Sequence, residues 1–165
     1  MQEVAVLLHN IRSVHNVGSV FRTSDAAGVS KVFLSGYTPT PVDRFGYARK
    51  DLSKVALGAE KTIPWEYEKN PYRIIAKLRE EGWQIAGVEQ DERSVDYRKF
   101  SARGGSASGG RTNKRTLFIL GNEVRGISPA LRKKCDYLIE IPMHGKKESL
   151  NVSVAAGIIL FSVLG

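Results

Sequence analysis

Residues 139–157, IEIPMHGKKESLNVSVAAG, join a short apolar run, a polar loop that contains glycine, and an almost wholly apolar segment. This order is typical of a strand that runs into a loop and then into a buried helix. Polar side chains held between two buried elements indicate a binding loop on a rigid frame. Residues 10–28, NIRSVHNVGSVFRTSDAAG, and residues 117–128, LFILGNEVRGIS, have a similar form. We therefore expect three strand-to-helix junctions to build one site.

The length and composition predict one folded domain over residues 1–165. Of the 165 residues, 42% are hydrophobic and 25% are charged, which is ordinary for a globular protein and excludes a disordered or membrane class. The first ten residues, MQEVAVLLHN, lack the basic start of a secretory signal and are too short an apolar run to span a membrane. We interpret them as a buried first strand. The single cysteine, Cys135, forms no internal disulfide and is interpreted as a helix-packing residue, so we expect a cytoplasmic protein without a membrane partner.

The charge balance favours a polyanionic partner. The chain has 25 Lys and Arg against 17 Asp and Glu, a net charge of +8. Residues 101–115 hold GGSASGG among basic residues and predict a flexible basic loop, either plainly solvated or in contact with RNA. A second basic set lies beside Phe45 and Tyr47, a mixture that suits stacking on exposed bases, and its members are Arg44, Arg49, Lys50 and Lys54. A solvated surface explains that second set equally well.

The periodicity alternates strands and helices. It predicts strands at 4–8, 32–34, 83–89, 116–120 and 137–141, and helices at 16–27, 51–57, 71–81, 129–134 and 150–164. This order predicts an α/β fold with a mostly parallel sheet and helices on both faces, in which ligands bind beyond the C-terminal ends of the strands. The final helix has no clean polar face, so we expect it to be covered on several sides, by the core or by a second subunit.

Several familiar chemistries do not fit the motifs. In GNEVRGIS the glycine spacing is that of a phosphate loop, but Ile127 stands where the lysine of an NTPase is needed. No G-x-G-x-x-G follows the first strand, which weakens the alternative of a nucleotide-dependent oxidoreductase. The histidines are scattered, no metal-ligand spacing occurs, and no serine lies in a nucleophile elbow. We therefore expect no metal.

Taken together, the three segments resemble the SpoU class, also called TrmH-like, of the SPOUT RNA methyltransferases. The similarity rests on N-V-G-S-V-F-R (residues 16–22), G-N-E-V-R-G (residues 121–126) and the segment from Ile141 to Asn151. The resemblance covers nearly the whole chain and implies an α/β fold with a C-terminal deep trefoil knot. It also implies S-adenosyl-L-methionine as methyl donor, a homodimer, and transfer to a ribose 2′-hydroxyl of RNA, either tRNA or rRNA. A protein of the same fold that binds RNA without catalysis is the alternative.

A methyl transferase needs a pocket for the donor, and loops rich in glycine and apolar residues can provide one. We expect the donor to contact seven residues, for which ordinary loop packing is the alternative: Val88, Leu120, Gly121, Ile141, Met143, Ser149 and Leu150. The resemblance makes Arg22 the central catalytic residue. Because free arginine is a poor proton acceptor, binding the substrate phosphate and orienting the hydroxyl is easier to justify than a role as base.

Four further polar residues complete the predicted catalytic set with Arg22. Arg22 lies about two turns after Asn16, so the two can lie near one face if Asn16 caps the helix. Asn16 either positions Arg22 or simply caps that helix. Glu123 is expected to anchor Arg12 or Arg125, or to hold a polar group of the substrate or cofactor. Ser149 and Asn151 are expected to cap the last helix and, by the resemblance, to face the cofactor or substrate.

The remaining expectations concern RNA. Arg12 and Arg125 are candidates for phosphate contacts, because both lie within the motifs. Without the extra N-terminal RNA-binding domain of some relatives, we expect a compact substrate such as a tRNA loop. The glycine-rich stretch before the second motif departs from the family pattern and could change which RNA is accepted.

Overall fold

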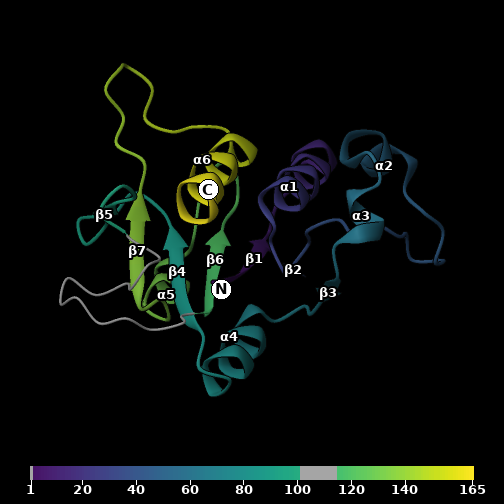
Figure 1. Cartoon of the computed structure of the whole chain (residues 1–165), viewed down its shortest axis with the longest axis horizontal. Helices are drawn as coiled ribbons and strands as arrows, with labels where there is room; N and C mark the ends of the chain where they lie inside the picture. The colour runs from purple at the N-terminus through teal and green to yellow at the C-terminus, as the bar shows by residue number, and fades with distance from the viewer. Residues whose placement is uncertain (1, 101–114) are drawn as a thin grey trace.

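The central feature of the fold is a seven-stranded sheet in which every pair of neighbouring strands is parallel, with the order β3-β2-β1-β6-β4-β7-β5. The computed structural model describes residues 2–100 and 115–165, and Figure 1 shows helices above and below the sheet. The strands are β1 (Glu3–His9), β2 (Lys31–Ser35), β3 (Trp65–Tyr67), β4 (Gln84–Val88), β5 (Val95–Asp96), β6 (Arg115–Leu120) and β7 (Tyr137–Glu140). The predicted mostly parallel α/β sheet is confirmed.

The two faces of the sheet are buried by different helices. The helices are α1 (Val14–Ala27), α2 (Lys50–Ala56), α3 (Ala59–Thr62), α4 (Pro71–Glu80), α5 (Pro129–Arg132) and α6 (Val152–Leu164). Along β1, Val4, Val6 and Leu8 face the cluster that includes α1, α2, α3 and α6. Ala5 and Leu7 face the cluster with α4 and α5. Successive residues of a strand point to opposite faces of the sheet. Because helices cover both faces here, the central strands are apolar throughout.

Local sequence signals account for several helix boundaries. Asn70 caps α4 with its side chain, Pro71 occupies the first turn, and Gly82 follows with φ of 84°. Ser128 caps α5 as predicted. Asn151 caps α6 by accepting the Ser153 N–H at 2.8 Å, so α6 begins at Val152 and Leu150 belongs to the preceding loop.

Three short elements were not predicted: β3, α3 and β5. They hold three, four and two residues, too few for a periodic pattern to emerge. Of the predicted basic loop, residues 101–114 lie outside the described residues, and Arg115 is the first residue of β6, where it pairs with Glu3. Cys135 follows α5 and packs against the apolar cluster that includes α4 and α5, as predicted, and burial raises the pKa of its thiol to about 11.

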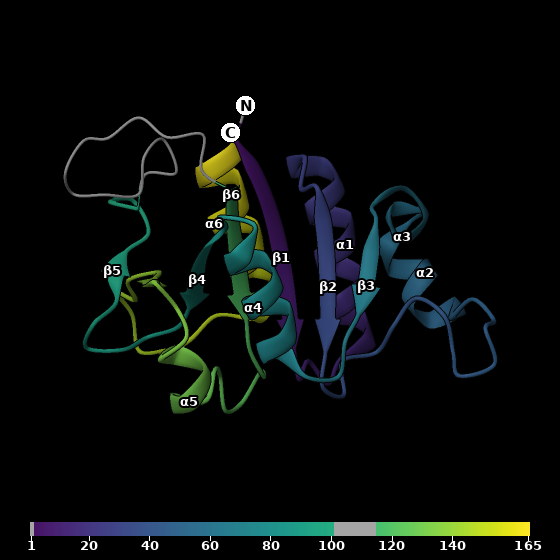
Figure 2. The ribbon, with the colours of Figure 1, turned by 90° about the horizontal axis from the view of Figure 1, so that it is seen from below.

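The core of the single chain covers only part of α6, and cover by a second subunit stays a prediction. Val152, Ala156, Ile159 and Leu160 are buried, but Phe161 remains 51% exposed. Within residues 2–100 and 115–165, no helix is both long and apolar enough to cross a bilayer. In Figure 2 the strands β1, β2, β3, β4 and β6 point towards one edge of the sheet, where the loops that follow them meet.

Candidate functional site

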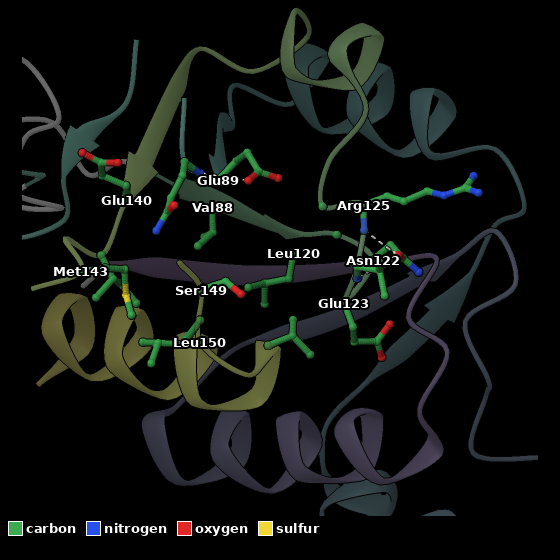
Figure 3. A pocket seen from close by; sticks show the side chains of 17 residues that line it. Val88, Glu89, Leu120, Asn122, Glu123, Arg125, Glu140, Met143, Ser149 and Leu150 are labelled. Atoms are coloured by element: carbon green, nitrogen blue, oxygen red, sulfur yellow. Dashed lines mark hydrogen bonds between the residues drawn. The ribbon is translucent and has the colours of Figure 1, made fainter. Parts of the chain in front are cut away.

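A cavity of about 200 Å³ opens beyond the C-terminal ends of β4, β6 and β7. All seven residues expected to contact the donor line it: Val88, Leu120, Gly121, Ile141, Met143, Ser149 and Leu150 (Figure 3). Val88 is the last residue of β4 and Leu120 is the last residue of β6, so the C-terminal ends of these two strands form the floor of the cavity. The structure therefore brings the second and third motifs together, and we call this cavity the main pocket.

One wall of the main pocket is the segment 121–127, which we call the glycine loop. The Gly126 N–H donates to the Asn122 carbonyl at 2.8 Å and closes the loop on itself. A side chain at Gly121 would meet the Gly126 carbonyl carbon at 2.5 Å, and Gly126 has φ of 64°. Both positions therefore need glycine, one for space and the other for its left-handed backbone. The loop is compact because its two glycines allow its ends to approach.

Glu89 supports the glycine loop from below. Its Oε2 accepts the Ile127 N–H at 2.8 Å, and its Oε1 accepts the Gln90 N–H at 3.0 Å. Both Glu89 and Gln90 line the main pocket, and neither was predicted. Their one sequence signal was their place at the end of a predicted strand, with Glu89 as its last residue and Gln90 directly after it, where parallel sheets bind ligands.

Asn122 ties the glycine loop to the neighbouring loops. Its Oδ1 accepts the N–H groups of Val124 at 3.0 Å and Arg125 at 2.9 Å. Its Nδ2 donates to the Asn10 carbonyl at 3.0 Å and to the Tyr37 hydroxyl at 2.9 Å. The side chain is almost fully buried and all of its polar atoms are bonded, so it fixes the loop in one conformation. Asn122 was not among the predicted site residues.

Glu123 joins the second motif to the first. Its carboxylate accepts the Arg12 N–H at 3.0 and 3.1 Å and the Ser13 N–H at 3.1 Å. The predicted anchoring of Arg12 is therefore correct for the backbone, while neither the Arg12 nor the Arg125 side chain pairs with this carboxylate among the described residues. Burial would raise the pKa of Glu123, but the hydrogen bonds from Arg12 and Ser13 outweigh it and lower the pKa.

Asn16 joins the first motif to both of the others. It lies in the first turn of α1, is buried, and does not cap the helix, because Ser13 does so by accepting the Asn16 N–H at 3.1 Å. Its Nδ2 donates to Glu123 at 3.3 Å, and its Oδ1 accepts from Asn151 Nδ2 at 3.1 Å. The capping alternative for Asn16 was wrong. Its side chain instead links the first motif to the second and third through hydrogen bonds.

Arg22 lies apart from these contacts. It is exposed on α1, does not line the main pocket, and makes no hydrogen bond or ion pair with any described residue. The expectation that Asn16 and Arg22 share one face was wrong, because six helical residues turn the chain by about 240°. Asn16 therefore does not position Arg22 directly.

The predicted RNA-contacting residues fall in two places. Arg12 is exposed at the start of α1, and Arg125 lines the main pocket through the glycine loop, with its side chain pointing away from Met143 and Ser149 (Figure 3). Arg44, Arg49 and Lys50 line a separate surface hollow. The structure thus places two cations beside the pocket and three outside it.

The other wall of the main pocket is the segment 141–150, which we call the motif-three loop. It supplies the apolar side chains of Met143 and Leu150 and the hydroxyl of Ser149 (Figure 3). Residues 142–149 make no hydrogen bond with any other described residue. Ser149 therefore does not cap α6, and its hydroxyl is available to a ligand.

The pocket combines an apolar floor with polar groups at its rim. Leu120, Ile141, Met143 and Leu150 suit a flat heteroaromatic ring, while Glu89, Gln90, Glu140 and Ser149 can bond hydroxyl or amino groups. Across residues 2–100 and 115–165, no three His, Cys, Asp or Glu residues gather in a way that could hold a metal ion. The arrangement suits an amphiphilic nucleoside better than a polyphosphate.

Comparisons with known proteins agree with this geometry. The chain is 33% identical over 159 residues to a 23S rRNA (guanosine-2′-O-)-methyltransferase RlmB of Pseudomonas syringae pv. tomato, and spans 96% of itself and 57% of that relative. A crystal structure of an AdoMet-bound rRNA methyltransferase from Sinorhizobium meliloti matches with a TM-score of 0.81 at 30% identity, over 97% of this chain and 55% of that one.

A second solved structure, a TrmH/SpoU tRNA modifying enzyme of A. aeolicus, matches with a TM-score of 0.79 at 28% identity, over 98% of this chain and 74% of that one. The curated relative is thus considerably longer than this chain. The model of the SpoU rRNA Methylase family matches residues 3–161, almost the whole sequence. The chain belongs to the SpoU rRNA methylase family.

Proposed function

We propose that this chain transfers a methyl group from S-adenosyl-L-methionine to a ribose 2′-hydroxyl of RNA. The observation that carries the proposal is that the second and third motifs line a pocket with an apolar floor and a polar rim at the C-terminal edge of a parallel sheet, while Asn16 of the first motif bonds to both of them. Support also comes from family membership, from a neighbour with bound AdoMet, and from a relative named for guanosine 2′-O-methylation.

The residues of the main pocket fit the donor. Leu120, Ile141 and Leu150 would pack against the adenine, and the glycine loop would offer backbone groups at Gly121. Met143, Ser149 and Val88 would complete the enclosure. When bound, the donor supplies an electrophilic methyl group on a sulfonium. The protein then has only to align the ribose 2′-oxygen with that methyl group and provide an acceptor for the hydroxyl proton.

We assign Arg22 to the RNA rather than to the donor. Its guanidinium has no partner among the described residues, and arginine binds phosphate well but accepts protons poorly. Because Arg22 lies outside the main pocket of its own chain, it would act on RNA that crosses the pocket rim or in the pocket of a second subunit. Asn16, Glu123 and Asn151 would hold the three motifs in register, and Ser149 would contact the ligand.

The assembly proposed here is a homodimer. On α6, Val154 and Phe161 are 49% and 51% exposed, which leaves an apolar face uncovered in the single chain. The trefoil knot implied by the family resemblance, and a cytoplasmic location, are proposed with it. Sedimentation equilibrium that showed only monomer at micromolar concentration would refute the dimer.

The proposed substrate is tRNA or rRNA, both of which occur in the names of the relatives. The test is incubation of the protein with methyl-labelled donor and total RNA from cells that lack it, followed by nucleoside analysis. We expect label in 2′-O-methyl nucleosides. RNA binding without label transfer would instead support the alternative of a non-catalytic RNA-binding protein.

A substitution of Arg22 tests its place in the reaction. We expect Arg22→Ala to lower kcat by about 100-fold or more, because loss of its phosphate contact would misplace the ribose hydroxyl relative to the methyl group. Donor affinity measured by calorimetry should be unchanged, since Arg22 does not line the main pocket. Arg73→Ala, on α4 at the other face of the sheet, is the control. Unchanged turnover in Arg22→Ala would remove this residue from the mechanism.

A further inference from the structure

A second hollow lies on the surface beside the segment 36–49, which connects β2 to α2. Its lining includes three aromatic side chains and three cations: Tyr37, Phe45, Tyr67, Arg44, Arg49 and Lys50. We call it the aromatic hollow. None of these side chains takes part in the fold's apolar clusters. The Tyr67 hydroxyl donates to the Gly36 carbonyl at 2.6 Å and the Tyr37 hydroxyl accepts from Asn122, whereas the Phe45 ring has no such role among the described residues.

The segment is held as a small hairpin. Val42 and Ala48 form an antiparallel bridge, and the Asp43 N–H donates to the Tyr47 carbonyl at 2.8 Å. At the tip, the Asp43 carboxylate accepts the Phe45 N–H at 2.8 Å and the Tyr47 N–H at 3.0 Å. The hairpin therefore presents Phe45 on a preformed backbone, which lowers the entropy lost when a ligand binds.

The exposure of the rings is unusual for residues of this kind. Phe45 is 69% exposed and Tyr37 is 58% exposed, although both are large. Burying such a ring against a flat partner removes apolar surface from water and adds stacking energy. Exposed rings on a rigid hairpin are therefore suited to a planar ligand.

The charges around the rings select a ligand that is also anionic. Arg44 lies over the Phe45 ring, with its guanidinium carbon 4.7 Å from the ring centroid. Arg49 pairs with Asp51 at 3.1 Å, whereas neither Arg44 nor Lys50 forms an ion pair with any described residue. Planar rings beside unneutralised cations match an unpaired nucleotide, which has a base to stack and a phosphate to neutralise.

One side chain connects the aromatic hollow to the main pocket. Tyr37 lines the hollow, and its hydroxyl accepts from Asn122 Nδ2 at 2.9 Å. Asn122 lines the main pocket and fixes the glycine loop there. The hydrogen bond between Tyr37 and Asn122 thus joins the linings of the two cavities.

We propose that the aromatic hollow is a subsite for an unpaired nucleotide that flanks the methylated one, with Phe45 stacking on its base and Arg44 and Lys50 contacting phosphates. The inference rests on the proposed function, since it adds a second contact to the same RNA. It assigns substrate selection in part to the catalytic domain itself. It also predicts a preference for single-stranded or looped RNA over continuous duplex.

The test is the affinity of a random-sequence 16-nucleotide single-stranded RNA, measured by fluorescence anisotropy in the presence of S-adenosylhomocysteine. We expect Phe45→Ala to weaken binding by roughly tenfold, and Phe45→Trp to restore it, because a ring of either kind can stack. Tyr72→Ala, which removes an exposed ring from α4, is the matched control and should bind like wild type. Dextran sulfate, a polyanion without bases, should bind equally to wild type and Phe45→Ala.

Several outcomes would overturn the subsite. They are unchanged RNA affinity in Phe45→Ala, no rescue by Phe45→Trp, or equal losses for RNA and dextran sulfate. Capture of an acidic protein by the hollow without any effect of Phe45→Ala on RNA would assign it to a different partner. Donor binding by calorimetry separates the two proposals: a wild-type protein that binds RNA through Phe45 but never binds the donor would refute the proposed function alone.

Discussion

The two walls of the main pocket differ in how they are held. The glycine loop, 121–127, is tied by hydrogen bonds to Glu89, Asn10, Tyr37 and the start of α1. In the motif-three loop, by contrast, residues 142–149 make no such bond to any described residue. One wall is fixed before a ligand arrives, while the other is free to adjust to it.

This difference suggests a division of labour. A fixed wall can define where the donor's reactive group lies, because catalysis requires alignment within a fraction of an ångström. An adjustable wall can admit the donor and then close on it through Met143, Ser149 and Leu150. The predictions below change one wall at a time and are arranged by the size of the expected effect.

The largest effect is expected when a methyl group is added to the fixed wall. In Gly121→Ala the new carbon would lie 2.5 Å from the backbone of Gly126, so the loop must open. We expect a loss of about 1–3 kcal/mol in unfolding free energy and at least roughly tenfold weaker donor binding. Denaturant titration and calorimetry measure the two quantities.

The matched change in the other wall is Gly145→Ala. Nothing lies within 4 Å of the added carbon, and Gly145 does not have a left-handed backbone. We expect stability and donor affinity close to wild type. Equal losses of stability and donor affinity in Gly121→Ala and Gly145→Ala would show that the two walls are equally rigid, which would contradict the difference described above.

An intermediate effect is expected from Glu123→Gln. The neutral amide accepts the N–H groups of Arg12 and Ser13 less strongly, and we expect a loss of about 1 kcal/mol, because the half-exposed site is partly screened. The folded-state pKa of Glu123 lies below the ordinary 4.5, so its contribution is complete above that pH and is lost as pH falls through the folded pKa.

The pH dependence separates this contribution from a general loss of packing. The difference in unfolding free energy between wild type and Glu123→Gln should shrink as pH falls from 6 to 3. Glu148→Gln, in the motif-three loop, removes a carboxylate that has no partner among the described residues and should show no such difference. A gap between wild type and Glu123→Gln that stays constant with pH would contradict the role assigned to the carboxylate.

The smallest effect is expected from Tyr37→Phe. It removes one of the two acceptors of Asn122 Nδ2 while the other, the Asn10 carbonyl, remains. Because Tyr37 is largely exposed and water can replace its hydroxyl, we expect a loss of about 0.5 kcal/mol in unfolding free energy. Amide hydrogen exchange at Val124 and Arg125 should quicken, whereas Tyr72→Phe should leave it unchanged. If exchange there does not respond, Tyr37 is no support of the fixed wall.

The strands and longer helices could be predicted because their signals are local. The unbroken apolar run of β1 and the sequence Asn70, Pro71 and Gly82 at the two ends of α4 are signals that depend only on neighbours in sequence. The membership of the main pocket was also predictable, since parallel strands place their following loops at one edge.

The roles of individual polar residues were harder to predict. Ser13 and Asn16 have similar capping tendencies, but Ser13 caps α1, whereas Asn16 bonds to Glu123 and Asn151, which are both distant in sequence. Glu89 and Asn122 were missed for the same reason, because their partners lie far along the chain. Tertiary contacts, rather than local propensity, determine these assignments.

The position of β6 between β1 and β4 affects the order in which the protein can assemble during synthesis. Until residue 120 has left the ribosome, the strands β1 and β4 have no common neighbour, and each exposes an edge whose backbone groups are unpaired. The two halves of the sheet must wait for a late segment to join them, and such long-range pairing slows folding. A nascent chain of this topology therefore has a vulnerable interval in which edge-to-edge association competes with correct closure.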